Sequence, residues 1–353
     1  MFLALKEIKH EKLRYSLIIA MIVLISYLIF VLTSLALGLA RQNTAAIDSW
    51  QIDRIVLNQD ANVNLSQSLL TKQQLAGIKL GAKEAYLGQV AVVAKASGHA
   101  KDSAQFIGLA ADQFVAKNLE LTSGHKPTNK QEIVVDTAFK DDGYQLGDRM
   151  QLNSASKSYQ IVGFTKNAKL SVAPVIYGTL TAWRQLKNMG PTFMASAIVS
   201  QDRTFTATSS QLKHYSTQQF IDKLPGYSAQ NSTFTFMIAF LMIISLIVIA
   251  VFLYILTVQK LQNYAVLRAQ GIPAKTLVGA TISQAVVLVI SGLLIGTLLT
   301  AVTAAVIPAS VPMTFDIPIL AAVALGLILT GIIGALFPVR LILRVDPVSV
   351  IGG

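Results

Sequence analysis

The sequence predicts an α-helical membrane protein with four transmembrane helices and one α+β extracytoplasmic domain, inserted between the first and second of these helices. Only 13% of the 353 residues are charged, whereas 53% are hydrophobic. The apolar residues gather in four blocks, each long enough to cross a hydrocarbon core of about 30 Å. Residues 41–232, between the first two blocks, are polar and numerous enough for one domain with its own core.

The chain begins with a basic segment followed by a long apolar run. Residues 1–14, MFLALKEIKHEKLR, are expected to form an amphipathic helix along the inner leaflet, with a solvated basic flank as the alternative. Residues 15–40 contain no charge and are expected to form the first span. The motif ALGLA within this run resembles a signal-peptide cleavage site. However, the run is far too long for a signal peptide, which predicts an uncleaved helix.

The domain at 41–232 alternates strand-like and helix-like runs, and residues 145–164 are expected to form a β-hairpin. Ser216 and Gln219 have the spacing of a capping box that begins a helix. The segment 224–233, LPGYSAQNST, is expected to link the domain to the second span. The expected strands are 52–57, 86–94, 105–109, 132–136, 149–152, 158–164, 175–179 and 195–199, and the expected helices are 66–79, 180–188 and 216–224.

Three further spans are expected in the second half of the chain. They cover residues 233–258, 277–307 and 317–339, and the last two are joined by an outer loop at 308–316. Small residues recur in the third and fourth spans and would allow close packing on another helix or on a second subunit. The alternative is that glycine is simply frequent in membrane helices. The small residues are Gly292, Gly296, Ala322, Gly326 and Gly331.

A short polar segment, 259–276, separates the second and third spans. Its sequence predicts a helix that ends abruptly, because Gly271 is placed to adopt the left-handed C′ conformation of a helix cap. Ile272 would then contact Leu267 as in a Schellman motif. Pro273 could begin the next helix at its first position. We therefore expect a helix, a sharp corner and a second helix at a membrane surface.

The distribution of basic residues predicts the topology. The short segments 1–14, 259–276 and 340–353 hold nine Lys or Arg against three acids. Short loops rich in Lys and Arg remain in the cytosol, so both termini and the 259–276 segment are expected there. The net charge of +11 is not evidence of nucleic-acid binding, because the basic residues flank the spans and are not interleaved with aromatic residues on one face.

The chemistry of common enzymes is missing from the sequence. There is no cysteine, and the motifs GxxxxGK[ST], HExxH and GxSxG do not occur. The four histidines, including His214, are interpreted as solvated residues, and no metal site or intrinsic cofactor is expected. The spans hold no charged residue, which argues against coupled ion transport. The chain is therefore expected not to be an enzyme and to receive its energy from a cytosolic ATPase.

Two motifs, KLQNYAVLRAQGIPAKTL and RVDPVSVIGG, resemble the coupling-helix and C-terminal signatures of the FtsX-like (MacB-type) ABC transporter permeases. Within this family, KEIKHEKLRYSLI, LGLARQN, LGDRM and DPVSVIGG are similar to the haem-exporting permeases. The resemblance implies a homodimer of permeases in contact with membrane lipid. It also implies two copies of a cytosolic ABC ATPase subunit that hydrolyse the ATP.

The resemblance also implies a coupling site in the 259–276 segment, where the ATPase would dock with Leu267 and Arg268 at the centre. The alternative is that Arg268 only contributes to the positive-inside charge. Many family members carry an acid where this chain has Gln262 and Asn263, so a salt bridge at that place is in doubt. The residues implied in coupling are Tyr264, Leu267, Arg268, Gly271, Pro273 and Lys275.

Haem as a possible substrate suggests candidate ligands, because ferric iron accepts a tyrosine oxygen as an axial ligand. Tyr177 and Tyr227 are the first candidates, Met237 and Met242 are weaker ones, and Arg41 could pair with propionates. Each residue also has a plain structural alternative. Tyr177 could be an ordinary strand residue, Tyr227 an interfacial anchor, the methionines packing residues and Arg41 a snorkelling helix end.

These observations lead to a permease subunit of an ABC efflux pump that exports haem from the plasma membrane of a Gram-positive bacterium. Two alternatives remain. One is a mechanotransmission permease that activates a cell-wall hydrolase or senses antimicrobial peptides, and the other is a lipoprotein-handling permease.

Overall fold

The computed structural model describes residues 11–153, 157–308 and 311–343, which form two compact units. The helical unit comprises Met1–Gly38 and Asn231–Gly353, and the sheet domain comprises Leu39–Gln230. Most of the amphipathic helix expected over residues 1–14 lies outside the described residues, as does the Asp-Pro pair near the C-terminus.

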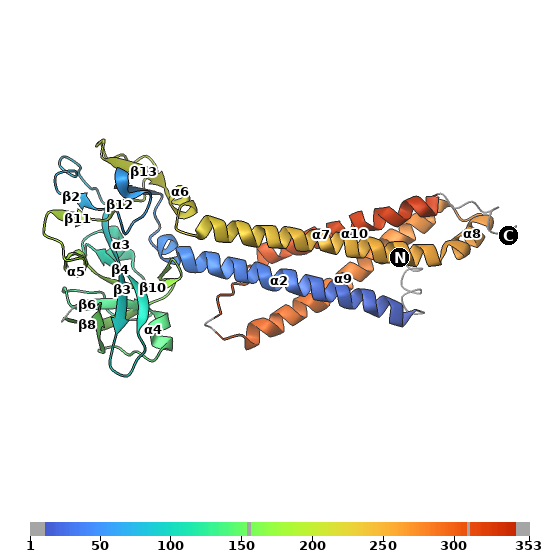
Figure 1. Ribbon diagram of the computed structural model, residues 1–353, viewed down its shortest axis with the longest axis horizontal. Helices are drawn as coiled ribbons and strands as arrows, with labels where there is room; N and C mark the ends of the chain where they lie inside the picture. Colours follow the sequence, from blue (N-terminus) through green and yellow to red (C-terminus); the bar gives the residue numbers. More distant parts are fainter. Residues whose placement is uncertain (1–10, 154–156, 309–310, 344–353) are drawn as a thin grey trace. The chain divides into compact units, whose positions relative to one another are not determined.

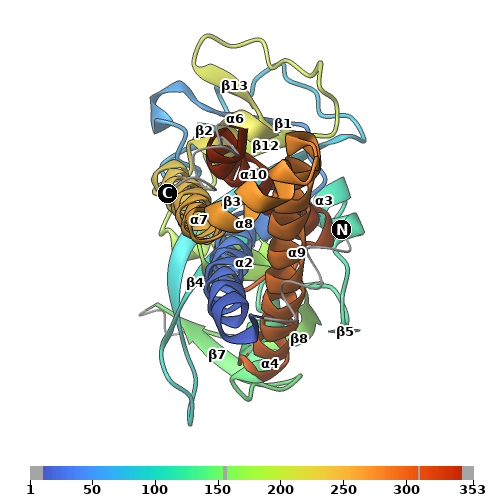
Figure 2. The same ribbon diagram turned by 90° about the vertical axis from the view of Figure 1, so that its right-hand side faces the viewer.

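The helical unit is built from long apolar helices that run side by side (Figures 1 and 2). Within the described residues, four helices are long and apolar enough to cross a membrane, which confirms the predicted four transmembrane helices. A shorter helix, α8 (Leu261–Ala269), follows the second of them. The four are α2 (Lys12–Ser49), α7 (Tyr227–Gln259), α9 (Ala274–Val306) and α10 (Ile317–Leu343).

All four helices extend beyond the ranges expected from hydropathy at one end or both, and α2 and α7 do so most. Helix α2 runs to Ser49, and its 38 residues span about 57 Å, well above the hydrocarbon thickness of about 30 Å. Ala45, Ala46 and Ile47 in its last turns are buried in the sheet domain, and this packing supports the extension. Helix α7 begins at Tyr227, inside the segment expected to be a linker, directly after Gly226 at φ +78°.

The glycines of α9 allow close packing within the chain itself. A Cβ atom added at Gly292 would collide with Ile22 of α2, and one at Gly296 would collide with Ser26 of α2. The Ser26 hydroxyl also donates a hydrogen bond to the Gly292 carbonyl at 3.4 Å. The GxxxG motif therefore packs on the first transmembrane helix of the same chain. Gly331 of α10 has a similar role, because a Cβ there would meet a Val289 methyl at 2.6 Å.

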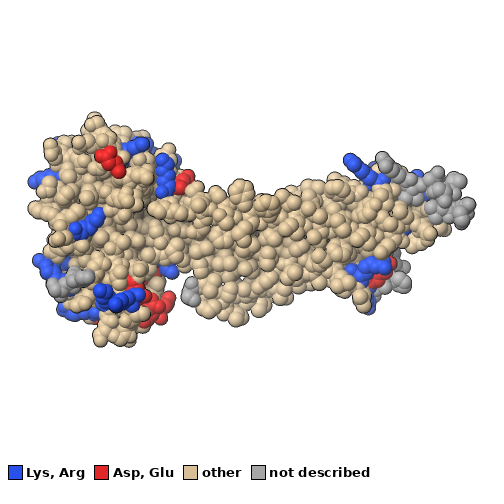
Figure 3. Space-filling model, in the orientation of Figure 1, with Lys and Arg blue, Asp and Glu red and all other residues tan. Residues whose placement is uncertain are grey.

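The surface of the helical unit agrees with a membrane location. In the view of Figure 3, its middle shows no Lys, Arg, Asp or Glu, and basic side chains gather at the end where α8 lies. Large apolar side chains such as Leu294 and Phe337 are exposed on its helices at 68% and 61%. Water would disfavour such a surface, whereas lipid tails would not.

The sheet domain lies between α2 and α7 in the sequence and confirms the predicted α+β fold. Its main sheet is mixed: β4 and β10 are parallel, as are β6 and β8, and the other described pairs are antiparallel. The strand order is β13 (Leu212–Ser216), β1 (Arg54–Asn58), β12 (Ala197–Ser200), β3 (Glu84–Lys95), β4 (Asp102–Leu109), β10 (Ala173–Thr179), β6 (Glu132–Asp136), β8 (Ser158–Thr165) and β5 (Ser123–Gly124).

Shorter elements complete this domain. Strand β7 (Arg149–Leu152) pairs with β3 and β8, and β9 (Lys169–Leu170) pairs with β10. A separate small sheet joins β2 (Leu70–Thr71) to β11 (Phe193–Ala195). The helices are η1 (Gln59–Ala61), α3 (Phe114–Asn118), α4 (Thr137–Asp141), α5 (Leu180–Leu186) and α6 (Thr217–Asp222).

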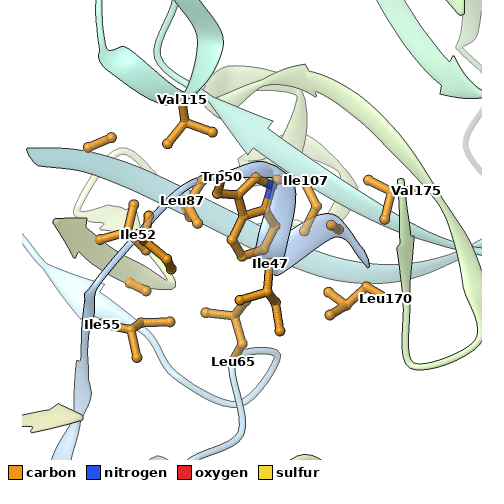
Figure 4. Packing of buried hydrophobic residues seen from close by; sticks show 14 of the residues in the cluster. Ile47, Trp50, Ile52, Ile55, Leu65, Leu87, Ile107, Val115, Leu170 and Val175 are labelled. Atoms are coloured by element: carbon orange, nitrogen blue, oxygen red, sulfur yellow. The ribbon is translucent and has the colours of Figure 1, made fainter. Parts of the chain in front are cut away.

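Two tryptophans organise the core of the sheet domain. Trp50, directly after α2, is surrounded by aliphatic side chains from several strands (Figure 4). Trp183 of α5 is fully buried, and its indole nitrogen donates to the Gln89 carbonyl at 3.0 Å. Gly88 and Gly108 on the neighbouring strands β3 and β4 leave room for Trp183, since a Cβ at Gly88 would collide with its indole and one at Gly108 with its Cβ.

Local sequence signals in this domain succeeded in two places and failed in one. Strands β7 and β8 pair as the predicted hairpin, and Ser216 and Gln219 form the predicted capping box. The helix expected at residues 66–79 is wrong. Leu70 instead pairs with Ala195 of β11 and is fully buried, so long-range strand pairing overrides the local helical periodicity.

His214 was interpreted as a solvated residue, but the structure gives it a specific partner. Its Nε2 accepts a hydrogen bond from the Ala207 amide at 2.7 Å, which requires the neutral ring. Burial lowers the pKa of His214, and the nearby Arg54 lowers it further.

Because the folded pKa is depressed, the stability from His214 is present above the unfolded value of about 6.5 and is lost as pH falls through the folded pKa. We expect hydrogen-exchange protection at Ala207, corrected for intrinsic rates, to fall between pH 7 and pH 5. A His214→Gln variant, which keeps an acceptor but does not titrate, should show a flat profile. An equal fall in both proteins would contradict this role for His214.

Candidate coupling site

The segment 260–276, called the corner below, joins α7 to α9. Helix α7 ends at Gln259, Lys260 precedes α8, and α8 ends at Ala269. Gly271 has φ +90°, the left-handed conformation that favours glycine. The Ile272 amide donates to the Leu267 carbonyl at 3.1 Å, and the Gly271 amide donates to the Arg268 carbonyl at 3.0 Å. These two bonds make the Schellman motif that the sequence predicted.

Pro273 differs slightly from its expected role. It was expected at the first position inside the next helix, but it lies at the N-cap with φ −65° and ψ 141°, and α9 begins at Ala274. The extended ψ takes Pro273 out of the helical region, while its carbonyl already accepts from the Thr276 amide at 2.9 Å. The sharp turn between α8 and α9 is therefore made by Gly271 and Pro273 together.

A small apolar cluster holds the corner against the longer helices. Tyr264 of α8, Leu277 of α9 and Ile342 of α10 are all buried in it. Leu267 and Ile272, which the Schellman motif links, pack against the same cluster. The corner is consequently fixed at the base of α9 and α10 by both backbone capping and side-chain packing.

The structure separates the residues implied in coupling by their exposure. Tyr264 is only 6% exposed, so it supports the corner from within. Leu267 and Arg268 are half-buried, whereas Gly271, Pro273 and Lys275 are exposed. A partner could therefore contact Gly271, Pro273 and Lys275. It could also contact the exposed parts of the Leu267 and Arg268 side chains.

The exposed face of α8 contains an apolar residue that the sequence reasoning missed. Val266 is 48% exposed. Gln262 and Asn263 on the same helix are also exposed, as is Gln270 at its C-cap. Positions 262, 266 and 270 share one helix face at intervals of four, a signal that was available in the sequence. An apolar side chain within a polar rim is typical of the centre of a docking surface.

Replacing Gly271 with alanine should loosen α8. A Cβ at Gly271 would meet no heavy atom within 4 Å, so the cost comes only from the left-handed backbone, at about 1–2 kcal/mol. We expect amide exchange in α8 to quicken about tenfold. Gly279→Ala in α9 is the matched control, because its Cβ also faces open space but its backbone is helical and alanine favours a helix. Equal exchange in the two variants would contradict the cap.

Among the candidate haem ligands, Tyr177 is placed where haem cannot reach it. The residue lies on β10, is fully buried, and its hydroxyl accepts a hydrogen bond from the Trp50 indole at 3.2 Å. Burial raises the pKa of Tyr177 to about 12, and the bonds from Trp50 and Ser49 only partly offset this. A tyrosinate ligand would require both loss of this proton and opening of the core, so we do not retain Tyr177 as a ligand.

The remaining candidates lie in accessible or partly accessible places. Tyr227 begins α7 and is partly buried against the sheet-domain core. Arg41 is exposed, and one of its guanidinium nitrogens donates to Asn167 Oδ1 at 3.4 Å. Met237 of α7 is 41% exposed, whereas Met242 packs within the helical unit, where its methyl lies 3.0 Å from a Cβ added at Gly326. Within the described residues, no group of three or more His, Asp or Glu could hold a metal ion.

Comparisons with known proteins define the class of this chain. It is similar over its full length to proteins named as ABC transporter permeases, including an uncharacterized one of Mycobacterium tuberculosis at 23% identity, which it covers to 99%. The four candidate transmembrane helices of this chain agree with that class of protein. More particularly, residues 235–347 match the FtsX-like permease C-terminal family, which confirms the resemblance seen in the sequence motifs.

Two staphylococcal relatives carry a more specific name. The chain is 25% identical over its full length to a protein of Staphylococcus epidermidis, 99% of which is covered. That protein's name proposes a role as the permease HrtB of a hemin transport system. A protein of Staphylococcus haemolyticus with the same name is also 25% identical over the full chain, with 99% of it covered.

Part of the chain also matches solved structures of two extracytoplasmic domains. The periplasmic region of MacB from Actinobacillus actinomycetemcomitans matches 48% of this chain and 91% of its own, with 12% identity and a TM-score of 0.36. The extracellular domain of the noncanonic ABC-type transporter YknZ from Gram-positive bacteria matches 45% of this chain and 84% of its own, with 11% identity and a TM-score of 0.32.

Proposed function

We propose that the protein is the permease subunit of an ABC-type efflux pump that exports haem from the membrane, using ATP hydrolysed by a separate HrtA-like cytosolic ATPase subunit. The observation that carries the coupling is the corner. A short helix with an exposed apolar residue is held by a Schellman motif and a buried cluster at one end of the helical unit. Such a rigid surface suits a partner that applies force.

The proposal includes an orientation and an assembly. The corner and both termini face the cytosol, and the sheet domain lies outside the plasma membrane of a Gram-positive bacterium. The positive-inside charge supports this orientation, and the staphylococcal relatives support the host. Two permeases form a homodimer in contact with membrane lipid and bind two ATPase copies. Nucleic acid has no part in the assembly.

Haem as the substrate is supported by the names of the full-length staphylococcal relatives. An amphiphilic haem plane would enter from the outer leaflet between α2 and α7. In this proposal Tyr227 of the sheet domain would supply an axial oxygen, and Arg41 would pair with a propionate. Met237 of α7 remains a weaker candidate ligand. Met242 serves packing in this arrangement, and Tyr177 takes no part.

A haem titration of the purified permease–ATPase pair tests the substrate. We expect a shift of the Soret band on addition of haem to the wild-type pair and a weaker shift with Tyr227→Phe. Tyr86→Phe, which removes the hydroxyl of another partly exposed tyrosine of the sheet domain, is the matched control and should titrate like the wild type. If haem produces no Soret shift, and deletion of the gene leaves haem tolerance unchanged, export of haem is excluded.

Mechanotransmission without a transported substrate is the second candidate function. The length of α2 favours it, because this one helix runs from Lys12 to Ser49 and is followed directly by Trp50 in the core of the sheet domain. Movement of the helix could then act on the domain outside the membrane. An intact ATPase complex that neither binds haem nor protects cells against it would favour this function.

A further inference from the structure

Three polar side chains from separate parts of the helical unit meet in a buried position. They are Tyr15 near the start of α2, Lys260 between α7 and α8, and Gln284 in α9. Their exposed fractions are 1%, 7% and 4%, although lysine and glutamine are mostly exposed in proteins. The three residues are called the Tyr15 cluster below.

The phenol oxygen of Tyr15 is the centre of the cluster. The Lys260 ammonium donates a hydrogen bond to it at 2.9 Å and lies 5.5 Å from the centroid of the ring. The Gln284 side-chain amide donates to the same oxygen. The phenol therefore accepts from two elements at once, while its ring face attracts the cation. A buried polar network of this kind is strongly sensitive to geometry, because loss of one contact leaves a desolvated group behind.

Lys260 belongs to the corner and follows its movement. Its amide donates to the Thr257 carbonyl of α7 at 3.1 Å, and its own carbonyl accepts from the Tyr264 amide of α8 at 2.9 Å. Its backbone therefore joins the end of α7 to the start of α8. Because the Schellman motif and the buried Tyr264 hold the rest of α8, a displacement of this helix also displaces Lys260.

Tyr15 provides the connection to α2. Its side chain lies at the start of a helix that continues to Ser49. Gln284 fixes the same oxygen from α9, whose Gly292 and Gly296 pack closely against α2. The Tyr15 cluster is thus a contact through which a shift of the corner changes the position of α2 relative to α9.

We propose that Tyr15, Lys260 and Gln284 are positioning residues that transmit displacement of the ATPase-docked corner to helix α2. This inference rests on the proposed function, because an ATPase has to move the corner. A cluster that served stability alone would be replaceable by well-packed apolar side chains. A transmitting cluster instead depends on directional hydrogen bonds from Lys260 to Tyr15.

The test uses the full-length permease with its ATPase in lipid nanodiscs. Hydrogen exchange of residues 39–49 in α2 is compared between the nucleotide-free and the ADP–vanadate-trapped complex, and ATPase co-purification is measured in parallel. We expect Tyr15→Phe and Lys260→Met to reduce the nucleotide-dependent exchange change about fivefold or more, the lower end of common coupling factors. ATPase should still co-purify, because neither variant alters the exposed face of α8. Lys260→Arg, which can still donate to the phenol, should restore most of the response.

Two matched controls distinguish transmission from general loss of stability. Tyr27→Phe removes another phenol hydrogen bond between α2 and α9, the 2.9 Å contact with Thr303, but does not touch the corner. Lys12→Met removes an exposed lysine from the first turn of α2. Both should respond to nucleotide like the wild type, and the double variant of Tyr15→Phe and Lys260→Met should show non-additive effects.

The possible outcomes are distinguishable. If the wild-type pair responds to nucleotide and Tyr15→Phe and Lys260→Met respond equally well, the transmission role is wrong while the proposed function stands. An equal loss of the nucleotide-dependent exchange change in Tyr27→Phe would also overturn the role. In that case any contact between α2 and α9 would be sufficient for the response, and the Tyr15 cluster would have no special part in it. If no ATPase accompanies the wild-type permease, the proposed function itself fails, and transmission fails with it.

Discussion

Replacement of Val266 with aspartate is expected to release the ATPase from the permease. Val266 is the large apolar residue exposed on α8, and a docked partner would exclude water from it. A carboxylate buried there without a counter-charge costs about 3–5 kcal/mol, which exceeds a hundredfold loss of affinity. Co-purification from detergent or nanodiscs, followed by titration of the separated ATPase, measures this loss.

Asn263→Asp provides the matched control for this variant. It adds one carboxylate to an exposed position of the same helix but leaves Val266 in place. The added carboxylate stays at the polar rim of the surface and does not replace its apolar centre, so the ATPase should remain bound. If Val266→Asp retains the ATPase as well as Asn263→Asp does, the docking surface lies elsewhere than on this face of α8.

Replacement of Trp50 with alanine should have the largest effect on the stability of the sheet domain. Trp50 is 2% exposed and lies at the centre of the aliphatic cluster of Figure 4, next to Ile47 and Ile107. Loss of a buried tryptophan side chain costs about 3–5 kcal/mol, through lost transfer energy and a residual cavity. Global protection of the domain amides against hydrogen exchange should fall accordingly.

Tyr177→Phe is the companion variant, because it removes only the hydroxyl that accepts from the Trp50 indole. Its expected cost is about 1–3 kcal/mol, because the donors of Trp50 and Ser49 lose their buried acceptor. Haem binding by Tyr177→Phe should equal that of the wild type, because the phenol is inaccessible. A lost Soret shift in a folded Tyr177→Phe protein would contradict the placement of this tyrosine in the core.

Features of the corner show which predictions the sequence supports best. Gly271 and Ile272 were expected in a Schellman motif, and the structure has both of its hydrogen bonds. This motif depends on residues within one turn of the helix, so local chemistry is sufficient to define it. The same holds for the capping box at Ser216 and for the hairpin of β7 and β8.

Predictions that depended on distant partners were less complete. Tyr264 was expected to take part in docking, but it is buried against Leu277 and Ile342. Both partners lie outside residues 260–270, so helical spacing within that segment does not predict these contacts. Lys260 was read only as a positive-inside charge. Its partner Tyr15 lies 245 residues away in the sequence, and no local pattern brings the two together.

The sequence by itself therefore determined the membrane class, the four apolar helices, the inserted α+β domain and the capped corner. Hydropathy, helix capping and hairpin pairing act over short stretches of chain, so they can be inferred residue by residue. Only the tertiary structure decided that Tyr177 is buried, that Gly292 and Gly296 face α2, and that Lys260 binds Tyr15. Burial and contact depend on which distant segments meet, and this follows from the packing of the whole chain.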